Sequence, residues 1–500
     1  MFKNMLARIR QVMYKMGLIK GIKKLADHKD IQINEDFYKY IGNWKALYKG
    51  YFSEWHDIRY TTIAGQKKRR MATLNMPKVV SQELATLIFN ERCEINISDK
   101  TLSESIHEVF KNNNFVKKFQ DYLEYQFAMG GMVIKPYVED EKLKLSYVTA
   151  DCFIPISWDH NTIREAVFLN EFSKKGKKYT HLEWHLWEGE TYLIRNEVFE
   201  SNTGEELGVK VSLKQFFPNL EDEIRISNYK RSGFVYFKPN IANNLDTTSP
   251  LGISIFANAL DTLHSLDIAF DSYQREFKLG KKRILVPDTA IQTVIDPLTG
   301  QMHRYFDAED EVYQAMALGD MDANKIADIS ATLRVEEHIS AINSLLNVLA
   351  MQIGFSSGAF TFDGQGVKTA TEVVSENSKT FRTKQSHENL IEAGIQELVE
   401  CIIQVAELYQ LFSRPEGEYE VTVAFDDSIA EDQNAEIAKQ VQLVTNQLTS
   451  KKKAIMKIHG FSEEEAEQLL KEIAEENATA TAEAIDFFGI NKNRQDQSET

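Results

Sequence analysis

Two histidines four residues apart, His181 and His185, are the first pair in the chain whose spacing could support chemistry. Each could offer an imidazole nitrogen to a zinc ion, which holds nitrogen ligands at about 2.1 Å. The surrounding residues alternate in type, since Thr180, Leu182 and Trp184 interleave with the histidines. This alternation is typical of a strand, on which residues four apart lie about 13 Å from each other. We therefore expect two structural histidines, with no metal and no other cofactor.

Acidic residues form three groups that could hold the paired metal ions of a nuclease. The groups are Asp307 with Glu309 and Asp310, Asp320 with Asp322, and Asp426 with Asp427. No histidine or lysine accompanies them at a recognisable spacing, and acidic residues of this kind are mostly exposed and solvated. A metal-dependent nuclease therefore stays as an alternative function and is not preferred.

Basic residues gather at three places, and none of these completes a phosphate-binding loop. Two are the runs Lys67–Arg70 and Lys174–Lys178. The third consists of Arg275, Lys278, Lys281, Lys282 and Arg283, at the end of a helical pattern. The helix dipole favours cations there, and the same residues could equally contact phosphates. The Gly-Lys pairs at 176 and 280 lack both the upstream glycine and the hydroxyl of a P-loop, so a P-loop motor is not expected.

The chain that carries these residues is 500 residues long, and this length favours two to four domains. Hydrophobic residues make up 43% of the chain and charged residues 26%, which excludes a wholly disordered protein. The net charge is −16, of which −11 belongs to residues 416–500, with 19 acidic and 8 basic residues. A tight nucleic-acid binder is not expected, because affinity for phosphate grows with Lys and Arg contacts.

Signals for membrane insertion or export are not found in the sequence. Apolar runs are only a few residues long, whereas a spanning helix needs about 20 apolar residues. Residues 1–24 carry seven Lys or Arg, but their apolar residues are interspersed rather than gathered into a block. Cys93, Cys152 and Cys401 are far apart, which suits a reducing compartment and argues against a disulfide framework.

The first half of the chain divides into a helical and a β-rich part. Residues 1–130 are expected to be mostly helical, as in Met76–Glu91 and Phe115–Met129, where apolar residues recur every three or four positions. Residues 132–237 are rich in β-branched and aromatic residues between short polar links, which predicts an antiparallel meander. The expected strands are Met132–Val138, Leu143–Thr149, Glu165–Phe172, Lys178–Trp187 and Thr191–Phe199.

Long helices are expected in the second half, because no proline lies between residues 298 and 414 or after 415. Apolar spacing predicts helices over Ile253–Leu279, about Arg334–Ile353 and Thr369–Phe412. A mixed segment at 281–330, with a strand at Arg283–Pro287, separates the first two helices. A short strand at 419–425 and further helices precede a polar tail at 491–500.

The loop Phe355–Gly366 joins the second and third of these helices and carries Phe355, Phe360 and Phe362 among small residues. In a monomer such a loop would expose an apolar tip at a cost. Two interpretations remain open: the phenylalanines fold back onto a core, or neighbouring subunits or a ligand contact them.

The order of these parts resembles the portal proteins of tailed double-stranded-DNA bacteriophages, most of all those of long-tailed phages of Gram-positive hosts. The residues that carry the resemblance are Met71–Glu91, Ser249–Gly252 and Gly366–Ser375 with its helical continuation. The likeness covers nearly the whole chain, and it rests on the ordered set of parts rather than on one diagnostic motif.

The resemblance implies an α+β portal fold with a β-rich wing, two stem helices, a small inserted clip domain, a long wing helix and a helical crown. The implied segments are 1–250 (wing, β-rich at 132–237), 251–280 (first stem helix), 281–330 (clip), 331–354 (second stem helix), 355–367 (tunnel loop), 368–412 (long wing helix) and 413–500 (wing strand, crown and disordered tail). It also implies a tunnel loop that borders DNA, with Phe355, Ser356, Ser357, Phe360, Phe362, Asp363, Gln365 and Lys368 as its channel residues.

The function that this resemblance implies is non-enzymatic: a ring of about twelve copies at one capsid vertex, through which duplex DNA is packaged and ejected. The implied partners are further copies of the chain, double-stranded DNA, the large terminase subunit, a head-completion or connector protein, and the major capsid and scaffolding proteins, but no membrane. The expected location is the virion, and the host cytoplasm during assembly. Two alternatives remain: a metal-dependent nuclease of phage or host DNA metabolism, and another structural component such as a scaffold or tail protein.

Overall fold

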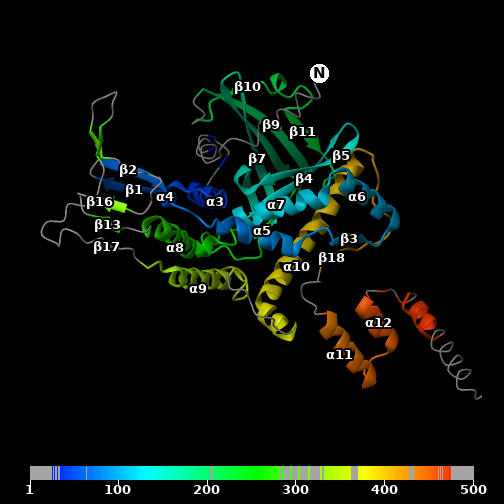
Figure 1. Cartoon of the computed structure of the whole chain (residues 1–500). Coiled ribbons are helices and arrows are strands. Elements are labelled where there is room, and N and C mark those ends of the chain that lie inside the picture. Colours follow the sequence, from blue (N-terminus) through cyan, green and yellow to red (C-terminus); the bar gives the residue numbers. More distant parts are fainter. Residues whose placement is uncertain are drawn as a thin grey trace, which may run out of the picture. The chain divides into compact units, whose positions relative to one another are not determined.

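The architecture comes from a computed structural model of the chain (Figure 1). It describes residues 34–62, 65–160, 162–202, 206–281, 332–361, 370–426, 433–459 and 465–474, together with residues 25, 28, 31, 461 and 463 and short strands between 284 and 328. The chain forms two compact units, one of Met1–Gly364 with Lys379–Asp426 and one of Gln365–Ser378 with Asp427–Thr500. Helices and antiparallel sheets share the first unit, so the expected α+β class is confirmed.

Helices precede the main sheets in the first unit, as expected. They are α3 (Glu35–Tyr48), α4 (Ser53–His56), α5 (Met76–Ile88), α6 (Lys100–Asn112) and α7 (Phe115–Met129). The predicted helices at 76–91 and 115–129 are confirmed as α5 and α7. Helix α7 lies at the centre of the core, where Phe119, Leu123 and Phe127 have no exposed surface and the helix packs against α5, α3 and the sheet strands.

The expectation that residues 1–130 are mostly helical overlooks three strands. Strands β1 (Asp57–Thr62) and β2 (Gly65–Arg70) pair as an antiparallel hairpin. Strand β3 (Glu94–Ile97) pairs with β18 (Val421–Ala424), more than 300 residues later in the sequence. The sequence of β2, Gly-Gln-Lys-Lys-Arg-Arg, has no apolar alternation, so periodicity does not reveal this strand.

Two antiparallel sheets form the β-rich part, and each of the five predicted strands coincides with an observed one. One sheet has the order β12-β4-β5 and the other β6-β7-β8-β9, with β10 and β11 both paired to β9. The strands are β4 (Met132–Glu139), β5 (Lys142–Thr149), β6 (Phe153–Asp159), β7 (Thr162–Lys174), β8 (Lys177–Glu188), β9 (Thr191–Ser201), β10 (Val209–Val211), β11 (Glu223–Ile226) and β12 (Val235–Phe237).

Three long helices follow the sheets: α8 (Leu260–Leu279), α9 (Val335–Ile353) and α10 (Ala370–Leu408), of which α10 belongs to the first unit from Lys379 onward. Between α8 and α9 lie the short strands of the inserted segment: β13 (Ile284–Val286), β14 (Thr293–Ile295), β15 (Met302–Arg304), β16 (Tyr313–Ala315) and β17 (Ala327–Asp328). Strand β13, predicted at 283–287, pairs with β16 and β17, and β14 pairs with β15.

Helix α8 begins seven residues later than the predicted start at Ile253, because tertiary contacts hold the preceding residues in another conformation. The Ile255 amide donates to Phe127 O at 3.0 Å, and Gly252 crosses Gly130 at close range. A Cβ atom at Gly252 would lie 2.3 Å from Gly130 O, and one at Gly130 would lie 2.5 Å from Gly252 O. Gly130 follows the helix predicted at Phe115–Met129, and Gly252 ends the segment Ser249–Gly252 that carries the resemblance. The backbones of these two segments cross at the two glycines.

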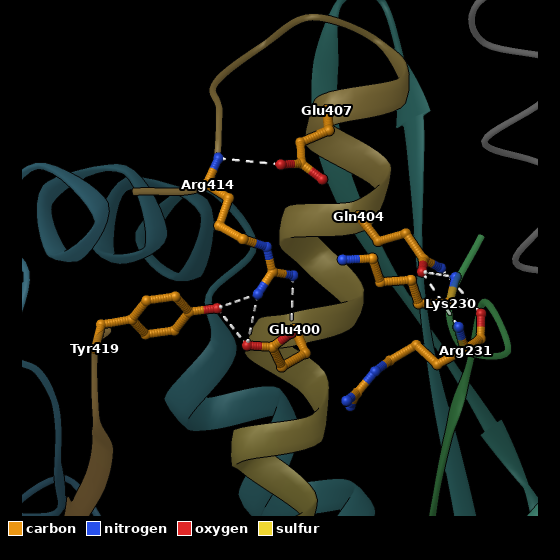
Figure 2. Close-up of polar contacts among 7 residues, drawn as sticks. All are labelled: Lys230, Arg231, Glu400, Gln404, Glu407, Arg414 and Tyr419. Carbon is orange, nitrogen blue, oxygen red and sulfur yellow. Dashed lines mark hydrogen bonds and ion pairs between the residues drawn. The ribbon is translucent and has the colours of Figure 1, made fainter. Parts of the chain in front are cut away.

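The carboxyl end of α10 is fixed to the sheet region by a polar cluster (Figure 2). The Gln404 side chain accepts from the amides of Lys230 and Arg231, at 2.9 and 3.3 Å, and donates to Arg231 O. On the next turn towards the start of the helix, Glu400 accepts from the Arg414 guanidinium at 2.9 Å and from the Tyr419 hydroxyl. These contacts hold the turn that leads from α10 to strand β18.

The second unit contains the helices expected after residue 425. They are α11 (Gln433–Thr445) and α12 (Lys451–His459), and residues 465–474 are also helical. Lys452 Nζ lies 2.6 Å from both Glu463 Oε1 and Glu467 Oε1, so this lysine joins two consecutive helices. The polar tail predicted at 491–500 lies outside the described residues.

Candidate functional site

Helices α8 and α9 pack side by side and carry the loop that the sequence singled out (Figure 1). Leu263 and Leu266 of α8, together with Ile342, Leu346 and Leu349 of α9, are buried along this pair. Burial of each such side chain stabilises the fold by about 2 kcal/mol. The pair is therefore a firm element that can position the segments at both of its ends.

Glu276, near the end of α8, connects this helix to the start of α9 at the end of the pair next to the inserted segment. Its carboxylate accepts from Arg334 Nη2 at 2.9 Å and from Arg334 Nε at 3.1 Å, while His338 Nε2 lies 3.7 Å away. The hydrogen bonds from Arg334 lower the pKa of Glu276 to about 2. The bidentate geometry fixes the first turn of α9 against the last turn of α8.

Asp267 ties the middle of α8 to the segment that follows the β1–β2 hairpin. It accepts from Thr73 Oγ1 at 2.7 Å, from the Leu74 amide at 3.0 Å and from His56 Nε2 at 3.0 Å. His56 Nδ1 accepts from the Phe52 amide, so the proton of the neutral ring lies on Nε2 and points to Asp267. Both side chains are buried, so the pair is structural and cannot reach a substrate.

Asp271, one turn further along α8, holds the hairpin itself. Arg69 donates to both of its carboxylate oxygens, at 2.7 and 2.6 Å, and the Ala72 amide donates at 3.1 Å. The hydrogen bond from Arg69 is the main reason why the pKa of Asp271 is lowered. The run Lys67–Arg70 thus contributes one of its cations to an internal ion pair.

The loop after α9 is attached to α10 by paired hydrogen bonds. Helix α9 ends at Gly354, whose φ of +89° is a left-handed conformation that glycine adopts without strain. The Ser356 amide donates to Thr380 Oγ1 at 2.8 Å, and Ser356 Oγ accepts from the Thr380 amide at 3.2 Å. Thr383 Oγ1 donates to Gly354 O and Lys379 Nζ to Met351 O, both at 2.7 Å. The start of the loop is therefore a fixed element.

The residues that were predicted to line a DNA channel differ in how far their side chains are buried. Phe355 and Ser356 are buried, Phe360 is half-buried against Phe355 with ring centroids 5.1 Å apart, and Ser357 is exposed. For Phe355 and Phe360 the structure favours the first interpretation, in which the rings fold back onto the core. Phe362, Asp363, Gln365 and Lys368 lie outside the described residues.

The predicted basic group at the end of α8 is only partly described. Arg275 is half-buried, whereas Lys278 and Lys281 are exposed. Lys282 and Arg283 lie outside the described residues. Lys278 and Lys281 are therefore two exposed cations at the start of the inserted segment.

The two histidines that suggested zinc lie on strand β8, as the alternation predicted. His181 Nε2 lies 3.0 Å from Asn196 Oδ1, while His185 contacts the Tyr192 hydroxyl at 2.7 Å and Glu183 Oε1 at 2.8 Å. Burial lowers the pKa of both rings. In the described parts of the chain, no group of three His, Cys, Asp or Glu side chains is placed to hold a metal ion.

The acidic groups considered for a nuclease are mostly beyond the described residues, since those at 307–310 and 320–322 belong to the inserted segment. Asp426 is described, and its carboxylate accepts from Asn90 Nδ2 at 3.2 Å and lies 3.7 Å from Arg92 Nη1. Its environment is that of a structural ion pair.

The surface of the helix pair that faces away from the core carries apolar side chains. Ile268 and Phe277 of α8 are 45% and 44% exposed, and Val348 and Met351 of α9 are 40% and 61% exposed. On α9 the exposed residues Glu337, Ala341, Ser344, Val348 and Met351 recur every three or four positions and form one stripe.

A comparison with protein families identifies the family of this chain. The family described as phage portal protein, SPP1 Gp6-like, matches residues 27–479. The chain belongs to this phage portal protein family. No curated protein matches the chain. Within the portion of the portal chain that the structure describes, no helix is long and apolar enough to cross a membrane.

Sequence reasoning missed the acidic residues that hold the portal chain's helix pair in place. Asp267 and Asp271 are four residues apart on a helix whose neighbouring positions are apolar, so they share one face of α8. That spacing was a usable signal for a buried polar contact. The partners at His56, Arg69 and Thr73 lie about 200 residues away and leave no local trace.

Proposed function

We propose that this portal protein forms a closed ring, expected to contain about twelve copies, at one vertex of a phage capsid. In this proposal the ring is the passage for double-stranded DNA during packaging and ejection. It docks the large terminase subunit and later the head-completion or connector protein, and it contacts the major capsid and scaffolding proteins. The match to the portal family over residues 27–479 is the observation that carries the proposal.

The exposed stripe on α9, with its apolar members Ala341, Val348 and Met351, supports an assembly of copies. Large contiguous apolar surfaces are uncommon on monomers and mark contact sites. A head-to-tail contact between two different surfaces closes into a ring when the rotation per copy divides a full turn. The stripe and the exposed side of α8 provide two different surfaces of this kind on one rigid helix pair.

The proposed roles of the segments follow their order in the chain. Helices α8 and α9 are the stem, the inserted segment with β13–β17 is the clip, and the sheets with α3–α7 and most of α10 are the wing. Helices α11 and α12 belong to the crown. The residues after Phe355 form the tunnel loop, of which Ser357 is exposed in the described part. Phe355 and Ser356 act as its anchors, because they are buried.

The proposed role requires no catalytic step. The passage is non-specific, and a net charge of −16 suits it, because the 74 acidic residues outnumber the 58 Lys and Arg and disfavour tight binding of phosphates. The energy for movement would come from a separate motor subunit.

The direct test is to determine the mass and symmetry of the purified full-length protein by native mass spectrometry and electron microscopy. We expect ring particles of about twelve copies with a central channel wide enough for duplex DNA. A protein that remains a monomer at micromolar concentration and in packaging buffer would refute the ring. Cleavage of DNA with magnesium or manganese by the purified protein would instead favour a nuclease.

A further inference from the structure

The β1–β2 hairpin is a basic surface on an acidic protein. Residues 57–70 contain five Arg or Lys and one Asp, a net charge of +4, whereas the whole chain carries −16. Most of the hairpin is exposed, including Arg59, Lys67 and Lys68. A concentrated positive surface on a negatively charged molecule attracts the acidic surfaces of other copies.

The register of the hairpin shows which cations point outward. Arg59 is paired with Lys68, so their side chains share one face, and Ile58 is paired with Arg69 on the other. Arg69 reaches Asp271 of α8, so its face is turned to the helix. The face that carries Arg59 and Lys68 therefore points away from α8.

On this outward face the hairpin brings two like charges directly opposite each other, which destabilises a strand pair. Lys68 Nζ lies 2.6 Å from Asp57 Oδ2, and this hydrogen bond, together with the charge of Arg59, lowers the pKa of Asp57. A single carboxylate therefore faces both cations, and an anionic group from outside the chain would reduce the repulsion that remains. The hairpin is anchored at its base by Arg69 and projects as a preformed arm.

The first turn of α9 offers the matching charge on the other side of α8. Glu336 and Glu337 are both exposed, and Glu337 begins the outward stripe that continues to Met351. Glu276, which contacts the start of α9, follows Asp271 by five residues and so lies about 140° around α8 from it. Figure 1 shows the same order of layers, with the hairpin and α9 on opposite sides of α8.

We propose that the outward face of the β1–β2 hairpin in one copy docks on the acidic first turn of α9 in the next copy. This inference rests on the proposed ring and names one of its contacts. In each copy the hairpin lies on one side of α8 and α9 lies on the other. When a second copy is placed beside the first in the same orientation, the basic hairpin of one copy therefore meets the acidic start of α9 in the other, which is a head-to-tail contact. The small and apolar residues along the rest of the α9 stripe allow the helices to approach at the same interface.

A charge-swap experiment tests the contact in the full-length protein. One variant carries Arg59→Glu with Lys68→Glu, a second carries Glu336→Lys with Glu337→Lys, and a third combines all four changes. The protein concentration for half-maximal ring formation is measured by mass photometry at low and high salt. We expect each double variant to raise this concentration about tenfold or more, and the combined variant to restore it to within about threefold of the wild type.

The matched control is Lys118→Glu with Lys175→Glu, which makes the same change in charge at exposed positions in the wing. It should change ring formation less than about twofold, since these lysines lie away from the proposed contact. Far-UV circular dichroism checks that all variants are folded. Rings that form normally in the hairpin variant, or a combined variant that is not rescued, would overturn the inference and leave the ring itself intact.

A cross-link provides a second, independent measurement. Arg59→Cys with Glu337→Cys should give a ladder of disulfide-linked copies on a non-reducing gel, which neither single variant gives. Absence of the ladder in assembled rings would contradict the contact. A hairpin variant that loses salt-sensitive retention of duplex DNA while its rings are intact would assign the basic face to DNA instead. A wild-type protein without rings would refute the proposed function, and this contact with it.

Discussion

In the sheet region the chain covers the outer edges of β5 and β9, whereas in the α8–α9 pair it leaves apolar side chains at the surface. The outer edge of β5 is occupied by Asn113, whose side chain accepts from the Leu145 amide and donates to Leu143 O, both at 3.0 Å. The outer edge of β9 is covered by both β10 and β11. Met351 of α9, by contrast, is 61% exposed.

The difference indicates which region depends on neighbours. Edge strands with free backbone groups invite pairing with other chains, and such pairing is prevented at β5 and β9. The helix pair has no free backbone groups to cover, but its outward stripe gains free energy only when another surface buries it. We infer that the sheet region folds by itself and that assembly is directed to the α8–α9 pair.

The largest expected change in stability tests the crossing of Gly130 and Gly252, which connects the sheet region to the segment before α8. Gly130→Ala places a Cβ atom 2.5 Å from Gly252 O at a residue with a φ of +86°, so both the backbone conformation and the crossing are strained. We expect a loss of about 4 kcal/mol or more in the free energy of unfolding, or failure to fold. Urea denaturation followed by circular dichroism measures it.

Gly189→Ala is the control for this change. Gly189 also has a positive φ, of +63°, but no atom lies within 4 Å of the added Cβ. It should cost only about 1 kcal/mol, the price of the backbone conformation alone. Equal losses at the two glycines would show that the crossing with Gly252 contributes nothing.

The second prediction concerns the polar anchor of α8. Asp267→Ala leaves three donors, from His56, Thr73 and Leu74, without their acceptor in a buried place. We expect a loss of about 3 kcal/mol in the free energy of unfolding. Asp261→Ala, an exposed position on the first turn of the same helix, should cost less than about 1 kcal/mol. Similar values for both variants would contradict a structural role for Asp267.

The third prediction is that stability depends on pH through a buried histidine on α10, His387. Burial lowers the pKa of His387 from 6.5 to about 4, and its Nδ1 accepts from the Asn240 amide. The unfolded chain therefore binds a proton at higher pH than the folded chain, so stability falls as pH drops from 6.5 to about 4. The full effect of this one ring is on the order of 3 kcal/mol.

Unfolding titrations of wild type and His387→Gln between pH 7 and 4 measure this dependence, because glutamine can still accept the hydrogen bond without titrating in this range. We expect a smaller slope in the variant. Part of the slope should remain, since burial also lowers the pKa of His181 and His185. Identical slopes in the two proteins would show that His387 is protonated equally in the folded and unfolded chain.

The smallest effect on stability is expected at the outward stripe. Val348→Ser with Met351→Ser removes exposed apolar groups and should change the free energy of unfolding of the single chain by less than about 1 kcal/mol. The same variant should reduce ring formation strongly, because the groups are buried only between copies. Val209→Ser, at a 73% exposed position on β10, is the control and should alter neither property.

Much of this fold was predictable because its elements are defined by local patterns. The five strands of the meander and helices α5 and α7 were found from period-2 and period-3.6 spacing, and the end of α9 at Ile353 was predicted correctly. The hairpin was not found, because β2 is held by pairing and by Arg69 rather than by an apolar face. The start of α8 was placed too early for a related reason, since apolar spacing continues through residues that the Gly130–Gly252 crossing keeps out of the helix.

The sequence by itself determined the class of the fold, the order of its parts and the family to which they belong. These depend on periodicity, composition and the succession of segments, all of which are local or linear properties. Only the tertiary structure decided that Phe355 and Ser356 are anchors of their loop, that Asp267 and Asp271 fasten the hairpin region to α8, and that Arg59 and Lys68 share the outward face. Such facts depend on residues brought together from distant positions, and burial and pairing at those contacts have no signature in the spacing along the chain.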